Sequence, residues 1–470
     1  MIYKRFQDIN FNKSPIIIFG SGPAGLSLAL DLEKKKINSI VIEAGGEDFD
    51  ENSQKIYKSK FTAVELTDAS VSRLRQLGGT SGHWGGWSKP FEDHDFDKWP
   101  ININDLNPYK EETCQILNIK NQFRRSNINS FFNQIEFQYS EVRFAEKYKD
   151  HIQKSKYIDL LLDTQLLYLS GKNKNIEYAV CINNDKKISL SSKFFILACG
   201  GIENSRILLW TKEKSQEILN NNKNIGNYWM THSWILAGSG LLSVNKLKNK
   251  LNDYFLNYEG PIHFSTKKNF SDIKNITSAG LYMDAQEDKK FYKEAIKDLL
   301  CVAPELGKKF ARMLFNKDLK CGNIFMHIED SPNKNNKITL DIKELDKFDM
   351  PITNINYERP ISVIKTAKNV MSEFAEFCRK DSIGRIAMHE DIFNLKKLDY
   401  LGEYHHMGGT RMGENLNNSV VDKNLKVHDI NNLFVAGSSV FPTCGFTNPT
   451  FTIIQLSIRL SNHMKNTLQL

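Results

Sequence analysis

Apolar and polar positions along this chain predict a mixture of strands and helices. Residues 16–19 are four consecutive apolar positions, which predict a buried strand. A helix-compatible stretch follows at 26–33, and a second short apolar run at 39–42 predicts another strand. Residues 337–342 alternate between polar and apolar positions, as is typical of a strand with one exposed face. The succession of strand, helix and strand near the N-terminus indicates an α/β fold.

A glycine-rich turn joins the first predicted strand to its helix. Gly20, Gly22 and Gly25 have the spacing of a dinucleotide-binding turn. Gly20 permits the tight turn, Gly22 lets the backbone approach a pyrophosphate, and Gly25 lets the helix pack closely on the strand. Glu43 follows the second strand, about 20 residues after the turn, where a ribose hydroxyl is normally bound. The glycines alone also fit an ordinary βα turn, but the strand before them and Glu43 after them favour a dinucleotide site.

Side chains suited to oxidation chemistry are concentrated near the C-terminus. His405 and His406 precede a glycine-rich bend, and Asn448 begins the sequence Asn-Pro-Thr. A histidine accepts a proton near neutral pH, because its unperturbed pKa is about 6.5. An asparagine amide donates a hydrogen bond to a developing alkoxide without titrating, although asparagine before proline is also common in turns. The segment therefore offers a base and an oxyanion partner for the oxidation of an alcohol.

Taken in order, these segments resemble the glucose-methanol-choline (GMC) family of FAD-dependent oxidoreductases. Four further blocks carry the resemblance: 75–84, 197–206, 224–227 with His232 after it, and 331–340. The resemblance implies an α/β fold in which a Rossmann-like FAD-binding domain is covered by a substrate domain with an antiparallel sheet. The implied FAD-binding domain is discontinuous and comprises 1–94, 190–230 and 400–470. The implied substrate domain comprises 95–189 and 231–399.

The family's catalytic residues fall on the C-terminal segment. Its histidine, in the pattern His-x-x-Gly-Thr, falls on His406, with Gly409 and Thr410 completing the match. His405 stays the alternative, because neighbouring residues of an extended segment point to opposite faces and only one imidazole should meet the flavin. The family's second catalytic position falls on Asn448. This pair of histidine and asparagine resembles the branch of pyranose 2-oxidase and bacterial sugar dehydrogenases.

The resemblance also implies which residues hold the FAD. His83 falls where a histidine of pyranose 2-oxidase is bonded covalently to the flavin, although a histidine that merely packs over the ring would give the same pattern. The expected cofactor-binding residues are Gly20, Ser21, Gly22, Ala24, Gly25, Glu43, Ala44, Arg75, Gly78, Gly79, Ser81, His83, Trp84, Ala198, Gly200, Gly437, Ser438, Asn448, Pro449 and Thr450.

The activity that the resemblance implies is oxidation of a CH–OH group of a sugar, polyol or sugar derivative. The hydroxyl proton would pass to the histidine and the hydride to flavin N5. Two alternatives stay open: a lyase of the same family that keeps FAD without using its redox chemistry, and a flavin subunit of a membrane or electron-carrier complex. The particular substrate, the electron acceptor and the oligomeric state also stay open at this point.

Composition narrows the partners of the chain. Its 470 residues, 40% hydrophobic and 25% charged, are typical of a folded protein with two packed domains. The seven cysteines are scattered without metal-binding or disulfide spacing, so we expect no metal site. The net charge of +8 comes from lysines spread among 55 acidic residues, without interleaved aromatic residues, so we expect no nucleic-acid partner.

Two segments of the sequence bear on membrane association. Residues 1–8 are basic but lack the apolar stretch and cleavage site of a secretory signal, and no apolar run reaches 18 residues, so we expect a cytoplasmic protein. Residues 293–317 have Leu, Phe and Lys at helical spacing, which fits a basic amphipathic helix that docks on a membrane surface or a partner. A helix that packs its apolar stripe on the substrate domain is the simpler interpretation.

Overall fold

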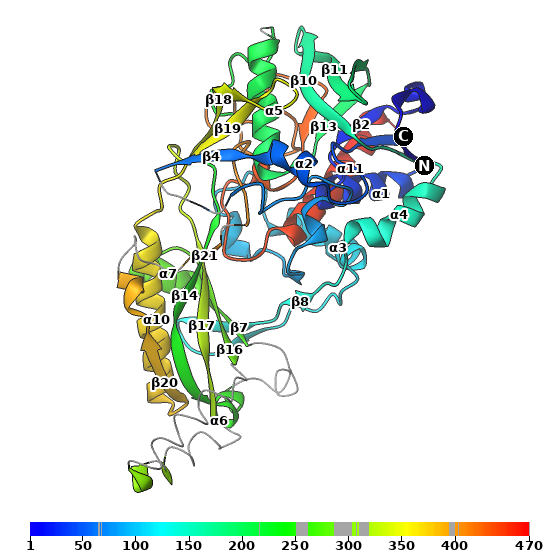
Figure 1. The fold of residues 1–470 in the computed structure, drawn as a ribbon. Helices are drawn as coiled ribbons and strands as arrows, with labels where there is room; N and C mark the ends of the chain where they lie inside the picture. Colours follow the sequence, from blue (N-terminus) through cyan, green and yellow to red (C-terminus); the bar gives the residue numbers. More distant parts are fainter. Residues whose placement is uncertain are drawn as a thin grey trace.

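The computed structural model describes residues 1–63, 66, 68–215, 217–250, 262–285, 303–306, 308–309, 319–393, 400–402 and 404–469. The chain forms two lobes along one long axis (Figure 1). The first lobe carries a parallel sheet with helices around it, and the second carries a large antiparallel sheet. Both chain termini lie in the first lobe (Figure 1).

The first lobe is built on a six-stranded sheet in the order β1-β9-β3-β2-β13-β22, in which every neighbouring pair is parallel. Its strands are β1 (Ile2–Tyr3), β2 (Ile16–Phe19), β3 (Ser39–Ile42), β9 (Ile158–Leu161), β13 (Phe194–Leu197) and β22 (Leu433–Val435). Strands β2, β3, β13 and β22 are buried along their whole length, which accounts for their continuous apolar sequences. The two strands predicted near the N-terminus and the α/β class are confirmed.

Three helices begin where strands of this sheet end. They are α1 (Pro23–Lys34) after β2, α5 (Gly200–Lys214) after β13, and α11 (Thr450–Leu468) after β22. Helices α1 and α11 pack against each other, while α5 packs on two smaller sheets. Because the carboxyl ends of parallel strands meet at one edge of a sheet, the N-termini of all three helices converge there.

The smaller sheets show where the expected domain division needs correction. One is antiparallel and consists of β10 (Thr164–Lys172), β11 (Asn175–Asn183) and β12 (Lys186–Leu190). The other consists of β18 (Lys337–Leu345), β19 (Pro351–Asn356) and β4 (Ser59–Thr62). Strand β9 belongs to the parallel sheet, although we expected all of 95–189 in the substrate domain. Strands β18 and β19 likewise pack on α5 rather than on the second lobe, because strand partners are chosen by contacts far apart in sequence.

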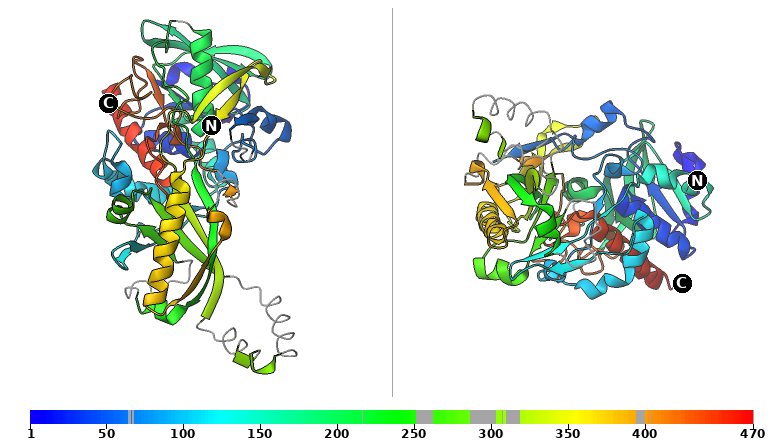
Figure 2. Two further views of the ribbon diagram at one scale, coloured as in Figure 1. Left: turned by 90° about the vertical axis from the view of Figure 1, so that its left-hand side faces the viewer. Right: turned by 90° about the horizontal axis from the view of Figure 1, so that it is seen from below.

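The second lobe is an eight-stranded antiparallel sheet in the order β20-β14-β17-β16-β15-β7-β6, with β21 paired to β14. Its strands are β6 (Arg125–Asn127), β7 (Phe132–Ile135), β14 (His232–Ser243), β15 (His263–Thr266), β16 (Ala279–Ala285), β17 (Leu319–Glu329), β20 (Gly384–Met388) and β21 (Tyr400–Gly402). Helix α10 (Ser362–Lys380) covers one face of this sheet (Figures 1 and 2) and buries Val363, Val370 and Phe374 against it. The expected antiparallel sheet is confirmed.

Short elements complete the described chain. They are α2 (Glu51–Gln54), α3 (Lys110–Leu117), α4 (Phe144–Lys154), α6 (Val244–Lys248), α7 (Lys268–Lys274), β5 (Trp87–Ser88) and β8 (Gln138–Tyr139). Most of the expected amphipathic helix at 293–317 lies outside the described residues. Among the helices that are described, none is both long enough and apolar enough to cross a membrane.

Candidate functional site

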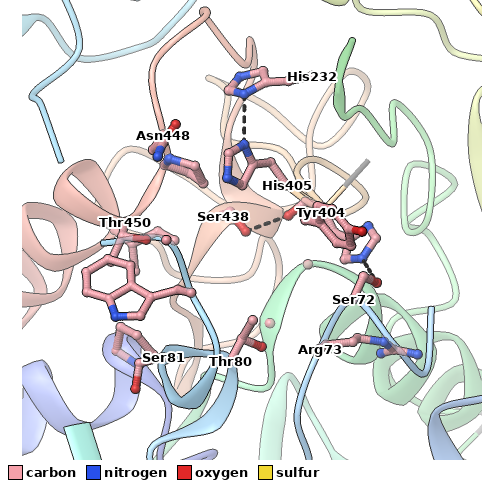
Figure 3. Close-up of a pocket in the computed structure, with 18 of the residues that line it drawn as sticks. Ser72, Arg73, Thr80, Ser81, His232, Tyr404, His405, Ser438, Asn448 and Thr450 are labelled. Carbon is pink, nitrogen blue, oxygen red and sulfur yellow. Dashed lines mark hydrogen bonds between the residues drawn. The ribbon is translucent and has the colours of Figure 1, made fainter. Parts of the chain in front are cut away.

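A cavity of about 790 Å³ is lined by residues of both lobes. From the first lobe come the β2–α1 turn and the starts of α5 and α11. From the second lobe come side chains of strands β14, β15, β16 and β17. The segment at 404–406 and the segment at 446–450 line the same cavity. The cavity therefore joins the predicted nucleotide turn to the predicted catalytic residues, and Figure 3 shows part of its lining.

The glycine turn between β2 and α1 leaves a bare stretch of backbone in the cavity wall. Gly20 has a φ of +104°, and a Cβ there would lie 2.4 Å from the carbonyl oxygen of Ala198. A Cβ on Gly25 would lie 1.9 Å from the carbonyl oxygen of Gly20, so helix and turn pack as closely as the sequence predicts. A Cβ on Gly22 would instead have open space around it, with the nearest atom, Gly79 Cα, at 4.0 Å. The backbone at Gly22 is thus accessible to a phosphate group.

Glu43 stands at the end of β3, beside this turn. Its Oε2 accepts hydrogen bonds from the backbone nitrogen and the hydroxyl of Ser21, at 2.9 and 2.6 Å, and its Oε1 accepts one from Gly45 nitrogen at 2.9 Å. Burial raises the pKa of the Glu43 carboxyl, while these hydrogen bonds act to lower it. A carboxylate has about four lone-pair sites, so it can still accept a bond from a ribose hydroxyl.

The three helix N-termini give the cavity an electrostatic preference. Pro23 of α1, Gly200 of α5 and Thr450 of α11 all line it, and each begins its helix. The first N–H groups of an α-helix have no acceptor within the helix, and the helix dipole places partial positive charge at that end. The arrangement favours a bound anionic group such as a pyrophosphate.

The two neighbouring histidines are held by different partners, and Figure 3 shows His405 beside His232. His406 Nε2 lies 2.7 Å from Ser72 Oγ, and its ring stacks on Trp229 with the centroids 5.7 Å apart. His405 Nδ1 lies 2.9 Å from Nδ1 of His232, the first residue of β14. Both imidazoles line the same cavity, although their hydrogen-bond partners differ.

Burial keeps these imidazoles neutral. It lowers the pKa of His406 to about 3, and the charge of Arg73 lowers it further. Burial lowers the pKa of His232 to about 4, against opposing hydrogen bonds to backbone groups. The pKa of His405 is also held well below its usual value, first by burial and then by the neighbouring imidazoles. Each ring is therefore neutral at pH 7, with one N–H group and one nitrogen that can accept a proton.

Asn448 lines the same cavity as the histidines (Figure 3). Its Nδ2 donates a hydrogen bond to the backbone oxygen of Trp87 at 2.8 Å, which fixes the direction of the amide. Within the described residues, its second amide hydrogen has no recorded acceptor. Asn448 can thus donate a hydrogen bond to an oxygen atom bound in the cavity.

His83 is an exposed residue of the cavity wall, next to Trp84. Burial by its surroundings lowers the pKa of the His83 imidazole, and the charge of Arg143 adds to this effect. The indole nitrogen of Trp84 donates to the backbone oxygen of Val142 at 2.8 Å and anchors the loop. A neutral imidazole facing the cavity is a nucleophile, as a covalent bond to a flavin would require.

Five of the expected cofactor-binding residues are not among the residues that line the cavity. They are Ser21, Gly25, Ala44, Arg75 and Gly78. The Arg75 guanidinium is buried and donates to Ser53 and Gln165, so it braces its own loop. A Cβ on Gly78 would lie 2.6 Å from the backbone nitrogen of Ala145, so this glycine allows two segments to pack closely. Arg75 and Gly78 thus have structural contacts of their own beside the cavity.

Other lining side chains were not expected from the sequence. They are Ser72, Arg73, Trp234, His263, Tyr282, His327 and Phe446. His232 and Trp234 are two residues apart on β14, and this spacing predicts that their side chains lie on the same face of the strand. The residues from β15, β16 and β17 share that face only through the pairing of the strands, which no local pattern encodes. Over the described ranges, no group of three or more His, Cys, Asp or Glu side chains is arranged to hold a metal ion.

A parallel sheet with an open glycine turn, an antiparallel sheet over it, and neutral imidazoles and an amide in the shared cavity are the features of a dinucleotide-dependent oxidoreductase. Residues 332–457 match the family model described as GMC oxidoreductase. Residues 332–457 thus carry the C-terminal part of a GMC oxidoreductase, and FAD is the cofactor expected from that similarity. The resemblance stated from the sequence is confirmed, and the bare backbone at Gly22 and the three helix N-termini fit that cofactor.

Similar proteins share the fold and part of the sequence. The 2-methyl-1,2-propanediol dehydrogenase of Mycolicibacterium austroafricanum is 27% identical over 58% of this chain and 48% of its own length. The fructose dehydrogenase large subunit of Gluconobacter japonicus is 24% identical over 59% and 48%. The chain thus spans about half the length of the curated relatives it matches. A formate oxidase structure from Aspergillus oryzae, concerned with modification of its FAD, matches 97% of this chain and 98% of its own at a TM-score of 0.59 and 12% identity, which shows the common fold.

Proposed function

We propose that this protein uses bound FAD to oxidise a CH–OH group of a sugar, a polyol or a related alcohol. One cavity is lined by the open backbone at Gly22, the imidazoles of His405 and His406, and the Asn448 amide, and this arrangement is the main support for the proposal. The relatives named as a propanediol dehydrogenase and a fructose dehydrogenase support this range of substrates.

The residues of the cavity divide the chemistry between them. FAD, when bound, supplies the acceptor for the hydride. One of the two imidazoles, His405 or His406, takes the proton of the substrate hydroxyl, which puts negative charge on the oxygen. Asn448 donates a hydrogen bond to that oxygen as the charge develops. The base and the amide thereby lower the barrier to loss of the hydride from the neighbouring carbon.

The walls of the second lobe favour an uncharged substrate. Trp234, Tyr282 and Phe446 supply aromatic faces, while His263 and His327 supply neutral hydrogen-bonding groups. Burial lowers the pKa of His263 to about 4 and that of His327 to about 3, so neither carries a charge at pH 7. Such a surface binds hydroxylated carbon skeletons through stacking and hydrogen bonds.

FAD is held on the first lobe in this proposal. Gly22 and the start of α1 would hold the pyrophosphate, and Glu43 would hold a ribose hydroxyl. His83 is the candidate for a covalent bond to the flavin. After acid precipitation of the FAD-loaded protein, a covalent bond leaves flavin in the pellet and His83→Ala releases it to the supernatant. Flavin in the wild-type supernatant would show that the cofactor is not covalently bound.

The oxidation is tested by loading the chain with FAD and adding alcohols without oxygen. Fructose, glucose, glycerol and 1,2-propanediol are suitable first substrates. We expect at least one of them to bleach the absorption band of the oxidised flavin. Substrate turnover with an unchanged flavin spectrum would indicate the lyase alternative, and failure to bind FAD would refute the site.

A further inference from the structure

We propose that His232 is a positioning residue, which fixes the tautomer of His405 and points its basic nitrogen into the cavity. Of the two imidazoles in the proposed function, His405 is then the one that takes the substrate proton. This assignment rests on the proposed function and deepens it. It differs from the position that the family motif favours, which falls on His406. The reasons lie in the hydrogen bonds of three imidazoles.

The backbone carbonyl of Cys444 fixes the tautomer of His232. His232 Nε2 lies 3.0 Å from that oxygen, and a carbonyl oxygen only accepts, so Nε2 carries the proton. A neutral imidazole has one N–H, and Nδ1 of His232 is therefore an acceptor. His405 Nδ1 lies 2.9 Å from it and must donate its own proton. The lone pair of His405 is consequently on Nε2.

The basic nitrogen of His405 faces the cavity. His405 is partly exposed and lines the cavity together with Asn448 (Figure 3). Its Nε2 has no hydrogen-bond partner among the described residues. This nitrogen is also not one of the fully buried polar atoms, so it is open to the cavity. A substrate hydroxyl in the cavity can therefore donate directly to this nitrogen.

His406 is held in a way that leaves neither ring nitrogen open. Its Nε2 is engaged by the Ser72 hydroxyl, and its Nδ1 is buried without a partner among the described residues. The ring stacks on Trp229, and the backbone oxygen accepts a 2.6 Å hydrogen bond from Ser438 Oγ. Protonation would also place a positive charge near the buried guanidinium of Arg73, which disfavours it. His406 thus shapes the wall, while His405 exchanges the proton.

The proton transfer balances with the proposed oxidation. The substrate O–H bond breaks as an N–H bond forms at Nε2 of His405, and the carbinol C–H bond breaks as its hydrogen leaves with both electrons for FAD. The resulting imidazolium of His405 keeps its Nδ1–H bond to His232. His232 in turn keeps its Nε2–H bond to Cys444, so the whole chain of donors points toward the carbonyl. This is the orienting role that a carboxylate has beside the histidine of a hydrolase, carried out here by a neutral ring.

The tautomers can be measured on the FAD-free protein. Nitrogen-15 NMR of the histidine side chains distinguishes a protonated from an unprotonated ring nitrogen, and His405→Gln and His232→Asn identify the two signals among the 11 histidines. We expect His405 to be protonated at Nδ1 and His232 at Nε2. A His405 ring protonated at Nε2 would overturn the proposal, whatever the substrate of the enzyme.

The assignment of the base is tested by reduction of the bound flavin. His405→Ala should slow reduction by roughly a hundredfold to ten-thousandfold, and added imidazole should restore part of the rate. His406→Gln should lose less, and imidazole should not rescue it. His151→Gln, at an exposed histidine of α4, is the control for a remote imidazole. Loss and imidazole rescue in a His406→Ala variant, with His405→Ala close to wild type, would overturn the proposal.

The positioning role is tested by two replacements of His232. Asparagine can present its Oδ1 to the Nδ1–H of His405, whereas leucine cannot. We expect His232→Leu to lower the reduction rate roughly tenfold to a hundredfold at unchanged FAD content, and His232→Asn to keep most of it. Equal losses in both variants would show that His232 is merely structural. A wild-type protein that binds FAD but is not reduced by any alcohol would refute the proposed function, while the NMR result would still decide the tautomer.

Discussion

Two glycines of the β2–α1 turn should respond in opposite ways to replacement by alanine. Gly25→Ala should lower the stability of the chain, whereas Gly22→Ala should lower its affinity for FAD. A Cβ at Gly25 would lie 1.9 Å from the carbonyl oxygen of Gly20, a backbone atom that cannot turn away. Overpacking of this kind costs about 1–3 kcal/mol, and the better helix propensity of alanine offsets up to about 1 kcal/mol of it. Gly25→Ala should therefore lower the free energy of unfolding of the FAD-free chain by about 1–2 kcal/mol.

Gly22 has a backbone conformation that alanine can adopt, with φ −72° and ψ −174°. Its Cβ would have no atom closer than 4.0 Å. Alanine has less conformational freedom than glycine in the unfolded chain, which stabilises the folded variant by about 0.4–1 kcal/mol. Alanine is also a weaker N-cap than glycine, which destabilises helix α1 by a similar amount. Gly22→Ala should leave the FAD-free chain as stable as wild type. The methyl group occupies the space that a pyrophosphate needs, so the affinity for FAD should fall at least tenfold, about 1.4 kcal/mol.

The assay has two parts for each variant. Urea unfolding followed by tryptophan fluorescence gives the stability of the FAD-free chain, and titration with FAD followed by flavin fluorescence gives the affinity. Gly25→Ala serves as the control that a tight glycine behaves differently from an open one. A Gly22→Ala protein that binds FAD as tightly as wild type would refute the placement of the pyrophosphate. A Gly25→Ala protein as stable as wild type would refute the packing of α1 on the turn.

Two further predictions concern buried charges. Arg206 is 1% exposed and paired with Glu203, so Arg206→Met should lower the free energy of unfolding by about 3–5 kcal/mol in urea titrations. The matched change Arg379→Met, at the same spacing from Glu376 but on the surface, should change it little, and equal losses would contradict the role of the buried network. Burial raises the Glu329 pKa from 4.5 to about 8, so the folded wild type should lose stability as the pH rises from about 4.5 to about 8, because the unfolded chain has already released that proton. Glu329→Gln should therefore be more stable than wild type at about pH 9 and gain nothing below about pH 4.5, and a pH-independent difference between the two would contradict this prediction.

Local sequence predicts the nucleotide turn because its constraints are local. Gly20 and Gly25 are glycines since a tight turn and a close contact fall within a few residues of each other. The strand partners of β9, in contrast, cannot be predicted from local sequence. Its four residues lie in the parallel sheet between β1 and β3, and a short apolar strand carries no information about its partners. For this reason the range 95–189, which we expected to lie wholly in the substrate domain, includes a strand of the first lobe.

The candidate site shows the same limit. The motif identifies His405 and His406, but which of them opens to the cavity depends on His232 in β14 and Ser72 in a distant loop. His327 reaches the cavity only because β17 pairs with β14 in a register that places both on one face. Chemical types can thus be read from the chain, whereas their mutual orientation is decided by the packing of the two lobes.

In the proposed function, a CH–OH group loses its hydride in this cavity. The most direct test is rapid mixing of the FAD-loaded protein, without oxygen, with an accepted alcohol and with the same alcohol deuterated at the carbinol carbon. We predict that the flavin band bleaches and that deuteration slows the bleaching severalfold. A flavin that stays oxidised in the presence of every alcohol, or bleaching at the same rate with both isotopes in single-turnover conditions, would contradict hydride transfer from that carbon as the step that this site performs.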